Sequence, residues 1–159
     1  MIDYLSKQIV TIEQEMMEII KTDERLNEQF RLIISIKGIG KQTALFMIAY
    51  THGFTKFKNW RKFASYCGIA PFPNLSGTSI RGKTKVSNLA NKRLKSLLDL
   101  CAKSAIQYNS EMKNYYSKRI GEGKNKMSTI NIIRNKLLAR IFAVVNRNTP
   151  YVDIMKYAA

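Results

Sequence analysis

Residues 32–50 read LIISIKGIGKQTALFMIAY, and this stretch predicts a helix, a tight turn and a second helix. Gly38 and Gly40 bracket the turn, where glycine permits a positive φ and a close approach of the backbone to a partner. We expect the second helix to begin near Lys41, with its free N–H groups and positive dipole end facing outward. Ala44 is small where close packing is needed. The stretch therefore predicts a helical domain with an electropositive turn.

This turn looks like a helix-hairpin-helix motif, in which a glycine–hydrophobic–glycine turn binds a DNA backbone phosphate without reading sequence. Gly38, Gly40 and Lys41 are accordingly candidate DNA-binding residues. A glycine-rich helical corner with a purely structural role is the alternative interpretation.

Upstream of the turn, apolar residues recur at alternating spacings of three and four, which is the a/d pattern of a coiled coil. The pattern is broken at Asp23 and comprises Ile2, Leu5, Ile9, Ile12, Met16, Ile19, Leu26 and Phe30. We predict a coiled-coil helix over residues 1–30, a separate domain over 31–159, and a homodimer or larger assembly through the helix. An amphipathic helix packed on its own domain is the alternative.

Downstream of the turn, the apolar spacing indicates further helices and shows no convincing strand alternation. A short helix follows the N-cap residue Asn59 and stops at Gly68; the others span about 88–108, 109–121 and 128–147. Residues 69–87 contain Pro71, Pro73 and two glycines, and we predict a long irregular loop there. The predicted fold class is all-α: a long N-terminal coiled-coil helix followed by a compact multi-helix domain.

The charge of the 159-residue chain is strongly positive and unevenly distributed. The formal net charge is +16, with a net −4 on residues 1–30 and +20 on residues 31–159. Such an excess on a folded domain favours a polyanionic partner, and DNA or RNA is the first candidate.

Histidine and cysteine are too sparse for several kinds of active site. Cys67 and Cys101 lie far apart without metal-ligand spacing, and His52 is the single histidine. This excludes the usual zinc site and any Ser-His or Cys-His catalytic pair within the chain, so we expect no metal site here. Both thiols are expected to be buried and free, as in a cytosolic protein.

No signal peptide or transmembrane run is present, so we predict a cytoplasmic protein without a membrane partner.

The predicted loop combines hydroxyl groups with cations. Ser76 precedes Gly77, and no acidic residue lies between His52 and Lys95. This composition suits phosphate chemistry on a polyanion, and equally suits phosphate binding without reaction. The candidate phosphate-binding residues of the loop and of the helix that follows it are Gly77, Arg81, Lys83, Lys85, Lys92, Arg93 and Lys95.

The order of the motifs resembles a known family. G-I-G is followed by FKNWRKFASYCGIAP, SGTSIRGKTKVS, NKRLKSLL and TPY. This order, over about residues 30–151, closely resembles the C-terminal domain of the insertion-sequence transposases that include the Piv-type DNA invertases. Some members of that family are guided by a bridge RNA, so the resemblance implies DNA, and in such members a guide RNA, as partners. It also implies a nucleoid-associated location of the bacterial type.

The resemblance implies a catalytic role for Ser76. In that family the serine before glycine attacks a DNA phosphodiester and forms a phosphoserine link. Arg81, Lys83 and Lys85 would stabilise the charge of the transition state. Asn88, Leu89 and Ala90 depart from the family pattern, which commonly has a basic pair and a glycine here.

The family's RuvC-like domain, with its metal-binding acidic residues, has no counterpart in this sequence. We therefore expect magnesium only with that domain, and an inactive chain when it is alone. The hypothesis is a DNA-binding, nucleophile-bearing part of a serine-type transposase or recombinase. A non-catalytic helix-hairpin-helix DNA-binding module is the alternative, and a coiled-coil assembly domain that binds RNA is a third.

Overall fold

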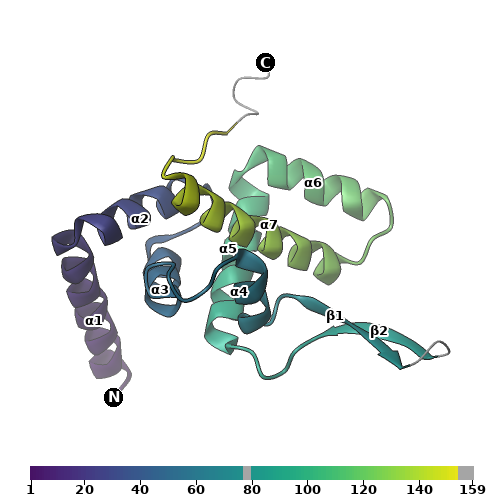
Figure 1. Cartoon of the computed structure of the whole chain (residues 1–159), viewed down its shortest axis with the longest axis horizontal. Helices are drawn as coiled ribbons and strands as arrows, with labels where there is room; N and C mark the ends of the chain where they lie inside the picture. The colour runs from purple at the N-terminus through teal and green to yellow at the C-terminus, as the bar shows by residue number, and fades with distance from the viewer. Residues whose placement is uncertain (77–79, 154–159) are drawn as a thin grey trace.

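The computed structural model describes residues 1–76 and 80–153, which form seven helices and one β-hairpin (Figure 1). The helices are α1 (Ile2–Thr22), α2 (Glu24–Ile34), α3 (Lys41–Thr51), α4 (Trp60–Tyr66), α5 (Lys92–Tyr108), α6 (Ser110–Gly121) and α7 (Lys126–Arg147). The strands are β1 (Pro71–Ser76) and β2 (Ile80–Val86). The predicted all-α class is confirmed, because the described chain is mainly helical. Among the described helices, none combines the length and the apolar character needed to cross a bilayer.

Asparagine side chains set the starts of four helices by accepting hydrogen bonds from the first-turn N–H groups. The predicted cap Asn59 accepts from the Lys62 N–H at 3.0 Å. Asn91 accepts from the Leu94 N–H at 3.1 Å, so α5 begins at Lys92 rather than near Asn88 as predicted. The other two capping asparagines are Asn109 of α6 and Asn125 of α7.

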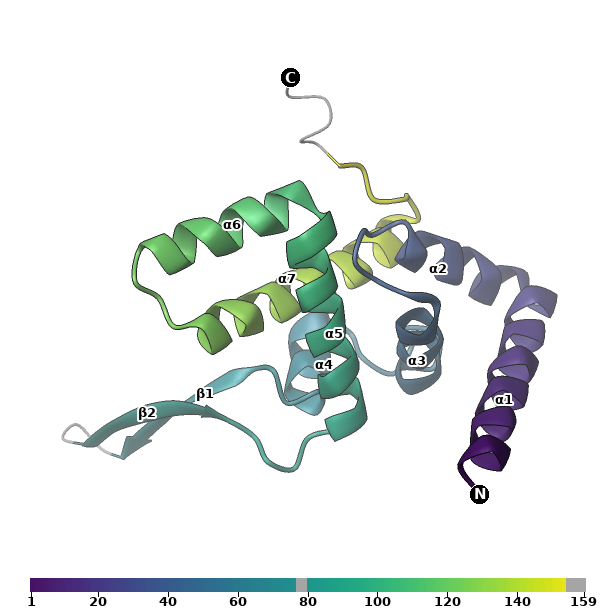
Figure 2. The same cartoon turned by 180° about the vertical axis from the view of Figure 1, so that it is seen from behind.

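The core is built around α5 and α7. Figure 2 shows α5 between α3 and α6, with α7 crossing it. Their inward faces carry fully buried side chains that include Leu94, Leu98, Ile133, Leu137 and Ile141. Cys67 and Cys101 are free and buried in the same core, as predicted.

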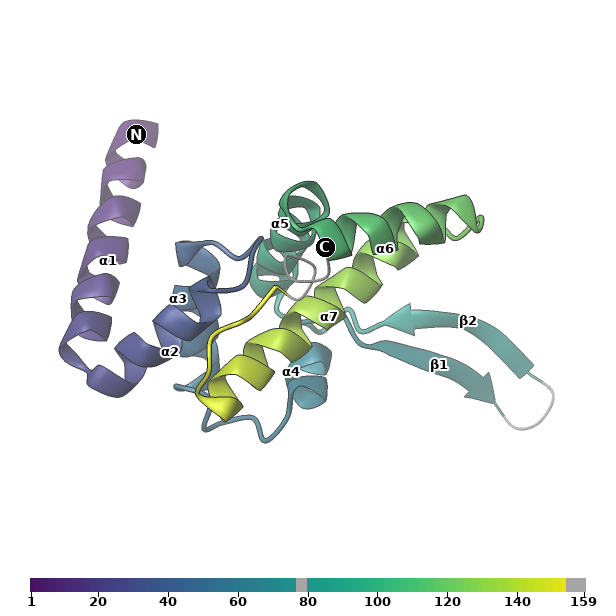
Figure 3. The ribbon, with the colours of Figure 1, turned by 90° about the horizontal axis from the view of Figure 1, so that it is seen from above.

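The N-terminal segment is two helices rather than the single helix that the heptads predicted. The chain bends at Asp23, whose side chain caps α2 by accepting from the Leu26 N–H at 3.0 Å. Phe30 on α2 is buried in the core, whereas the α1 stripe is exposed at Ile9 and Ile12 (53% and 52%). The heptad stripe therefore divides at the position where Asp23 interrupts it. Figure 3 shows α1 standing at the end of the molecule opposite the hairpin.

The strands β1 and β2, at residues 71–76 and 80–86, pair as an antiparallel hairpin, which corrects the irregular loop predicted there. Pro71 pairs with Val86 and Phe72 with Lys85, and the register then shifts so that Asn74 pairs with Gly82. Two steps along β1 match three along β2, which is the signature of a β-bulge. Prolines, glycine and the bulge hide the alternation by which a strand is recognised in sequence. The hairpin projects away from the helices (Figures 1 and 3).

Candidate functional site

The base of the hairpin is fixed to the helical body at two points. Gly68 has φ +66°, and a Cβ there would lie 2.3 Å from the Cβ of Ala90, so only glycine lets the two ends of the hairpin segment approach. On the other side, the Ile69 carbonyl accepts hydrogen bonds from the side-chain amides of Asn131 at 2.9 Å and Asn135 at 3.0 Å. Both asparagines lie on α7, and sequence analysis did not single them out.

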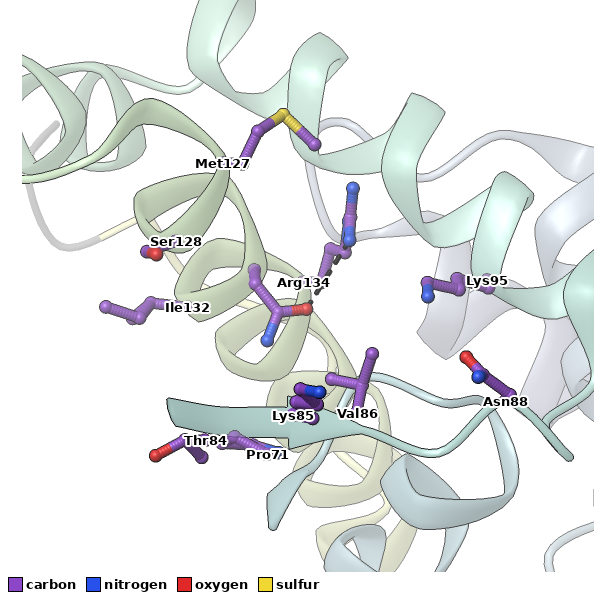
Figure 4. Close-up of a pocket in the computed structure, with 11 residues that line it drawn as sticks. Pro71, Thr84, Lys85, Val86, Asn88, Lys95, Met127, Ser128, Ile132 and Arg134 are labelled. Atoms are coloured by element: carbon purple, nitrogen blue, oxygen red, sulfur yellow. Dashed lines mark hydrogen bonds between the residues drawn. The ribbon is translucent and has the colours of Figure 1, made fainter. Parts of the chain in front are cut away.

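A groove of about 710 Å³ lies where the hairpin base, α5 and α7 meet (Figure 4). Its described lining is Pro71, Thr84, Lys85, Val86, Asn88, Lys95, Met127, Ser128, Asn131, Ile132 and Arg134. None of these residues is acidic. Figure 4 shows Lys95 reaching from α5 towards Arg134 of α7. The groove thus collects cations and hydrogen-bond donors from three elements.

Arg134 is the buried cation of this groove, with 6% of its surface exposed. Its guanidinium forms an ion pair with Asp99 of α5, and Asp99 also accepts from Lys103 Nζ at 2.7 Å. Burial acts to raise the pKa of Asp99, but the hydrogen bonds and charges of Lys103 and Arg134 outweigh it and hold the pKa below its usual range. Asp99 is therefore ionised near neutral pH and fixes the Arg134 side chain. Nothing in the sequence distinguished Arg134, because it occurs on a largely apolar helix.

The predicted hairpin residues are spread along its length. Ser76 is the last residue of β1 and pairs with Ile80; Arg81 and Lys83 lie in β2, and Gly77 lies outside the described residues. Lys85 is exposed near the base and lines the groove. At ~3.3 Å per residue, five steps from Pro71 place Ser76 about 17 Å from the hairpin base.

The predicted cations at the start of α5 divide between two surfaces. Lys92 is exposed and Lys95 lines the groove. The Arg93 guanidinium instead lies over the Phe46 ring of α3, 5.4 Å from its centroid. Of these three residues, the structure therefore places only Lys95 in the groove.

The glycine turn before α3 differs from its prediction at both glycines. Gly38 has the expected positive φ of +98°, but a Cβ there would lie 2.7 Å from the Cβ of Ala105, so its close approach is to α5 and not to an outside ligand. Gly40 has φ −91°, not a positive value, and caps α3 with open space around its Cβ position. The turn is thus a packing corner at Gly38 and an open helix start at Gly40.

The start of α3 also lies beside acidic residues of α1. Lys41 is exposed, and it lines a hollow with Glu13 and Glu18. The Gln42 side-chain amide donates to a Glu13 carboxylate oxygen. Carboxylates compete with a phosphate for a positive helix end. The groove, whose described lining is free of acids, is therefore the better candidate site for a polyanion.

The side chains that activate nucleophiles do not gather in the described part of the chain. Its residues contain no group of three His, Cys, Asp or Glu side chains placed to hold a metal ion. Burial raises the pKa of Cys67 to about 12 and also raises the pKa of Cys101, so both thiols stay protonated near neutral pH. The geometry of the described residues therefore supports polyanion binding.

Comparison of the sequence with known proteins identifies several relatives. A pilin gene-inverting protein of Moraxella bovis is 30% identical over 153 residues, which cover 94% of this chain and 47% of that protein. The protein of the same name from Moraxella lacunata matches with the same identity and coverage. An uncharacterized 43.6 kDa protein of insertion element IS110 from Streptomyces coelicolor is 27% identical over 120 residues, 76% of this chain and 29% of that protein. The chain thus spans about half the length of the two gene-inverting proteins, and less of the insertion-element protein.

The sequence pattern of the family described as "Transposase IS116/IS110/IS902 family" matches residues 30–117. These residues run from the end of α2 into α6 and include the whole hairpin. The match covers more than half of the chain, and this protein therefore belongs to the IS116/IS110/IS902 transposase family.

Proposed function

We propose that this chain is the DNA-binding, nucleophile-bearing part of a serine-type transposase or site-specific recombinase. The observation that carries the proposal is the hairpin, which projects from the helical body with Ser76 at the end of β1 and an acid-free basic groove at its base. The two gene-inverting relatives support a role in DNA rearrangement.

Ser76 would act by covalent capture of a DNA strand. Its hydroxyl oxygen attacks phosphorus, a new P–O bond to serine forms, and the bond to the leaving strand oxygen breaks. The serine proton passes to a base, and the leaving oxygen takes up a proton. The resulting phosphoserine diester conserves the bond energy, so a second strand end can displace serine without ATP. Arg81 and Lys83 are the proposed cations that stabilise the charge developing on phosphorus. Lys85, the third cation predicted for this role, pairs with Phe72 near the hairpin base and lines the groove instead.

Activation of the serine requires groups beyond those in the described chain. A serine hydroxyl is a weak nucleophile without a base or a metal ion beside it. The family resemblance implies magnesium held by the carboxylates of a RuvC-like domain. The described residues do not fit such a site, because no acidic or histidine cluster is present among them and the groove is lined by cations. The carboxylates that hold such a metal ion would therefore come from another domain or subunit.

The test is formation of a covalent protein–DNA adduct after the acidic domain is supplied together with magnesium. We expect an adduct with the natural chain and with Ser79→Ala, and none with Ser76→Ala, while DNA affinity changes no more than a few-fold. Ser79 is the matched control because it is a serine of the same segment without a glycine after it. An adduct that survives Ser76→Ala would overturn the assignment.

A non-catalytic DNA-binding module is the second candidate function. The open Gly40 position and the exposed Lys41 at the start of α3 favour it, because a phosphate could approach the backbone N–H groups there. On that account Gly40→Val weakens DNA binding without loss of helical circular dichroism, and no adduct forms under any condition.

A further inference from the structure

We infer that the groove at the base of the hairpin is a second phosphodiester-binding site. In this site Arg134, Lys95 and Lys85 bind the DNA backbone at a point distant from the phosphate that Ser76 attacks. The inference rests on the proposed function for the identity of the polyanion as DNA. It joins Lys85 and Lys95, which belong to the sequence motifs, to Arg134 of α7, which lies outside them.

The local charge is the first support. Residues 29–98 carry 13 lysines and arginines and no acidic residue. In the groove, Lys85 and Lys95 approach from β2 and α5, and the amides of Asn88 and Asn131 and the hydroxyl of Ser128 add hydrogen-bond donors. Cations and neutral donors together are what a phosphodiester requires, since its oxygens only accept hydrogen bonds.

The arrangement of Arg134 is the second support. A guanidinium has five N–H donors, and here one nitrogen bonds to Asp99 and another lies 3.4 Å from the side-chain oxygen of Asn131. Nε is buried and has no hydrogen-bond partner among the described residues. Asp99 shares its charge between Arg134 and Lys103, so the three side chains together keep a net positive charge. Arg134 lines the groove, so a phosphate there would accept from those N–H donors of the guanidinium that reach the groove surface, on a side chain that is already held in place.

The groove is separate from the position of Ser76. About 17 Å of strand lies between Pro71 and Ser76. Successive bases of one DNA strand rise ~3.4 Å, so this length corresponds to about five nucleotides. One phosphate therefore does not reach both places. A strand bound in the groove would be anchored at a fixed distance from the bond that Ser76 attacks.

The test is the salt dependence of binding to a 20-base-pair duplex of arbitrary sequence, measured by fluorescence anisotropy between 50 and 200 mM NaCl. Each phosphate contact contributes about −0.9 to the slope of log affinity against log salt. We expect Lys95→Gln and Arg134→Gln each to make the slope less steep by about 0.9. Lys7→Gln, the same charge change on α1, is the matched control and should leave the slope unchanged.

Thermal melting separates binding from folding. If Arg134 served only to join α5 to α7, Arg134→Gln and Asp99→Asn would lower the melting temperature. The slope of log affinity against log salt would then stay equal to that of the natural protein. Lys95 is only partly buried, so Lys95→Gln should fold normally and keeps the test decisive if Arg134→Gln does not fold. Unchanged slopes in folded variants would overturn the groove site, even if the Ser76 adduct forms. A changed slope without an adduct would instead leave the groove site and refute the nucleophile.

Discussion

Gly38 and Gly40 show how one short motif contains two different physical requirements. Gly38 has a left-handed φ of +98°, and a Cβ added there would collide with the backbone and Cβ of Ala105 on α5. Gly40 has an ordinary φ of −91° and open space at its Cβ position. The sequence G-I-G predicted a tight turn before a helix. Whether each glycine is packed against another element or open to solvent depends on where α5 packs, and the motif does not contain that information.

We therefore expect Gly38→Ala to lower the free energy of unfolding by about 2 kcal/mol or more, through backbone strain and overpacking against Ala105. Gly40→Ala is the control and should cost no more than about 1 kcal/mol, the value of an N-cap. Urea denaturation followed by circular dichroism measures both. Equal losses for the two variants would contradict the assigned packing of Gly38.

Asp99 predicts a pH dependence of stability. Its pKa is lowered in the folded protein, because hydrogen bonds and charges from Lys103 and Arg134 outweigh the effect of burial. A lowered folded pKa contributes stability that is present above the unfolded value of roughly 4 and is lost as pH falls through the folded pKa. The natural protein should thus melt higher than Asp99→Asn near pH 6, and the difference should shrink below about pH 4. A difference that stays constant down to pH 2 would refute the ion-pair cause.

The helices and the hairpin differ in how well the sequence predicts them. The starts of α4 and α6 follow from Asn59 and Asn109, because capping is a local interaction between neighbouring residues. The hairpin was missed because Pro73, Gly82 and the bulge remove the two-residue alternation, and its position depends on Asn131 and Asn135, about 60 residues later. The groove was missed for the same reason: Arg134 and Lys95 line one groove only because α5 and α7 pack together.

The exposed apolar stripe of α1 predicts that the protein associates with a second copy of itself. On α1 the a/d residues Ile2, Leu5, Ile9, Ile12 and Ile19 are more than half exposed, whereas α2 packs in the core. We propose that α1 pairs with α1 of a second copy, because a coiled coil would cover this stripe. Removal of residues 1–22 should convert the assembly to a folded monomer in analytical ultracentrifugation. A monomeric full chain would contradict the pairing.

The molecule as a whole separates charge along its length. The net −4 of residues 1–30 lies on α1 and the start of α2, at the opposite end from the hairpin, while residues 31–159 carry +20 (Figure 3). A polyanion is therefore attracted to the body and hairpin and repelled from the acidic helix. On the proposed function, this polarity would orient DNA towards the groove and Ser76 and leave α1 for pairing with a second copy.

The central claim is that Ser76 becomes linked to DNA, and peptide mapping of the covalent adduct tests it most directly. Nuclease digestion should leave a nucleotide on the tryptic peptide of residues 63–81, whose hydroxyl side chains are Ser65, Tyr66, Ser76, Thr78 and Ser79. Fragmentation in tandem mass spectrometry distinguishes the five hydroxyls. The account predicts the nucleotide on Ser76 alone. A nucleotide on Ser65, Tyr66, Thr78 or Ser79, or on any other peptide, would contradict it.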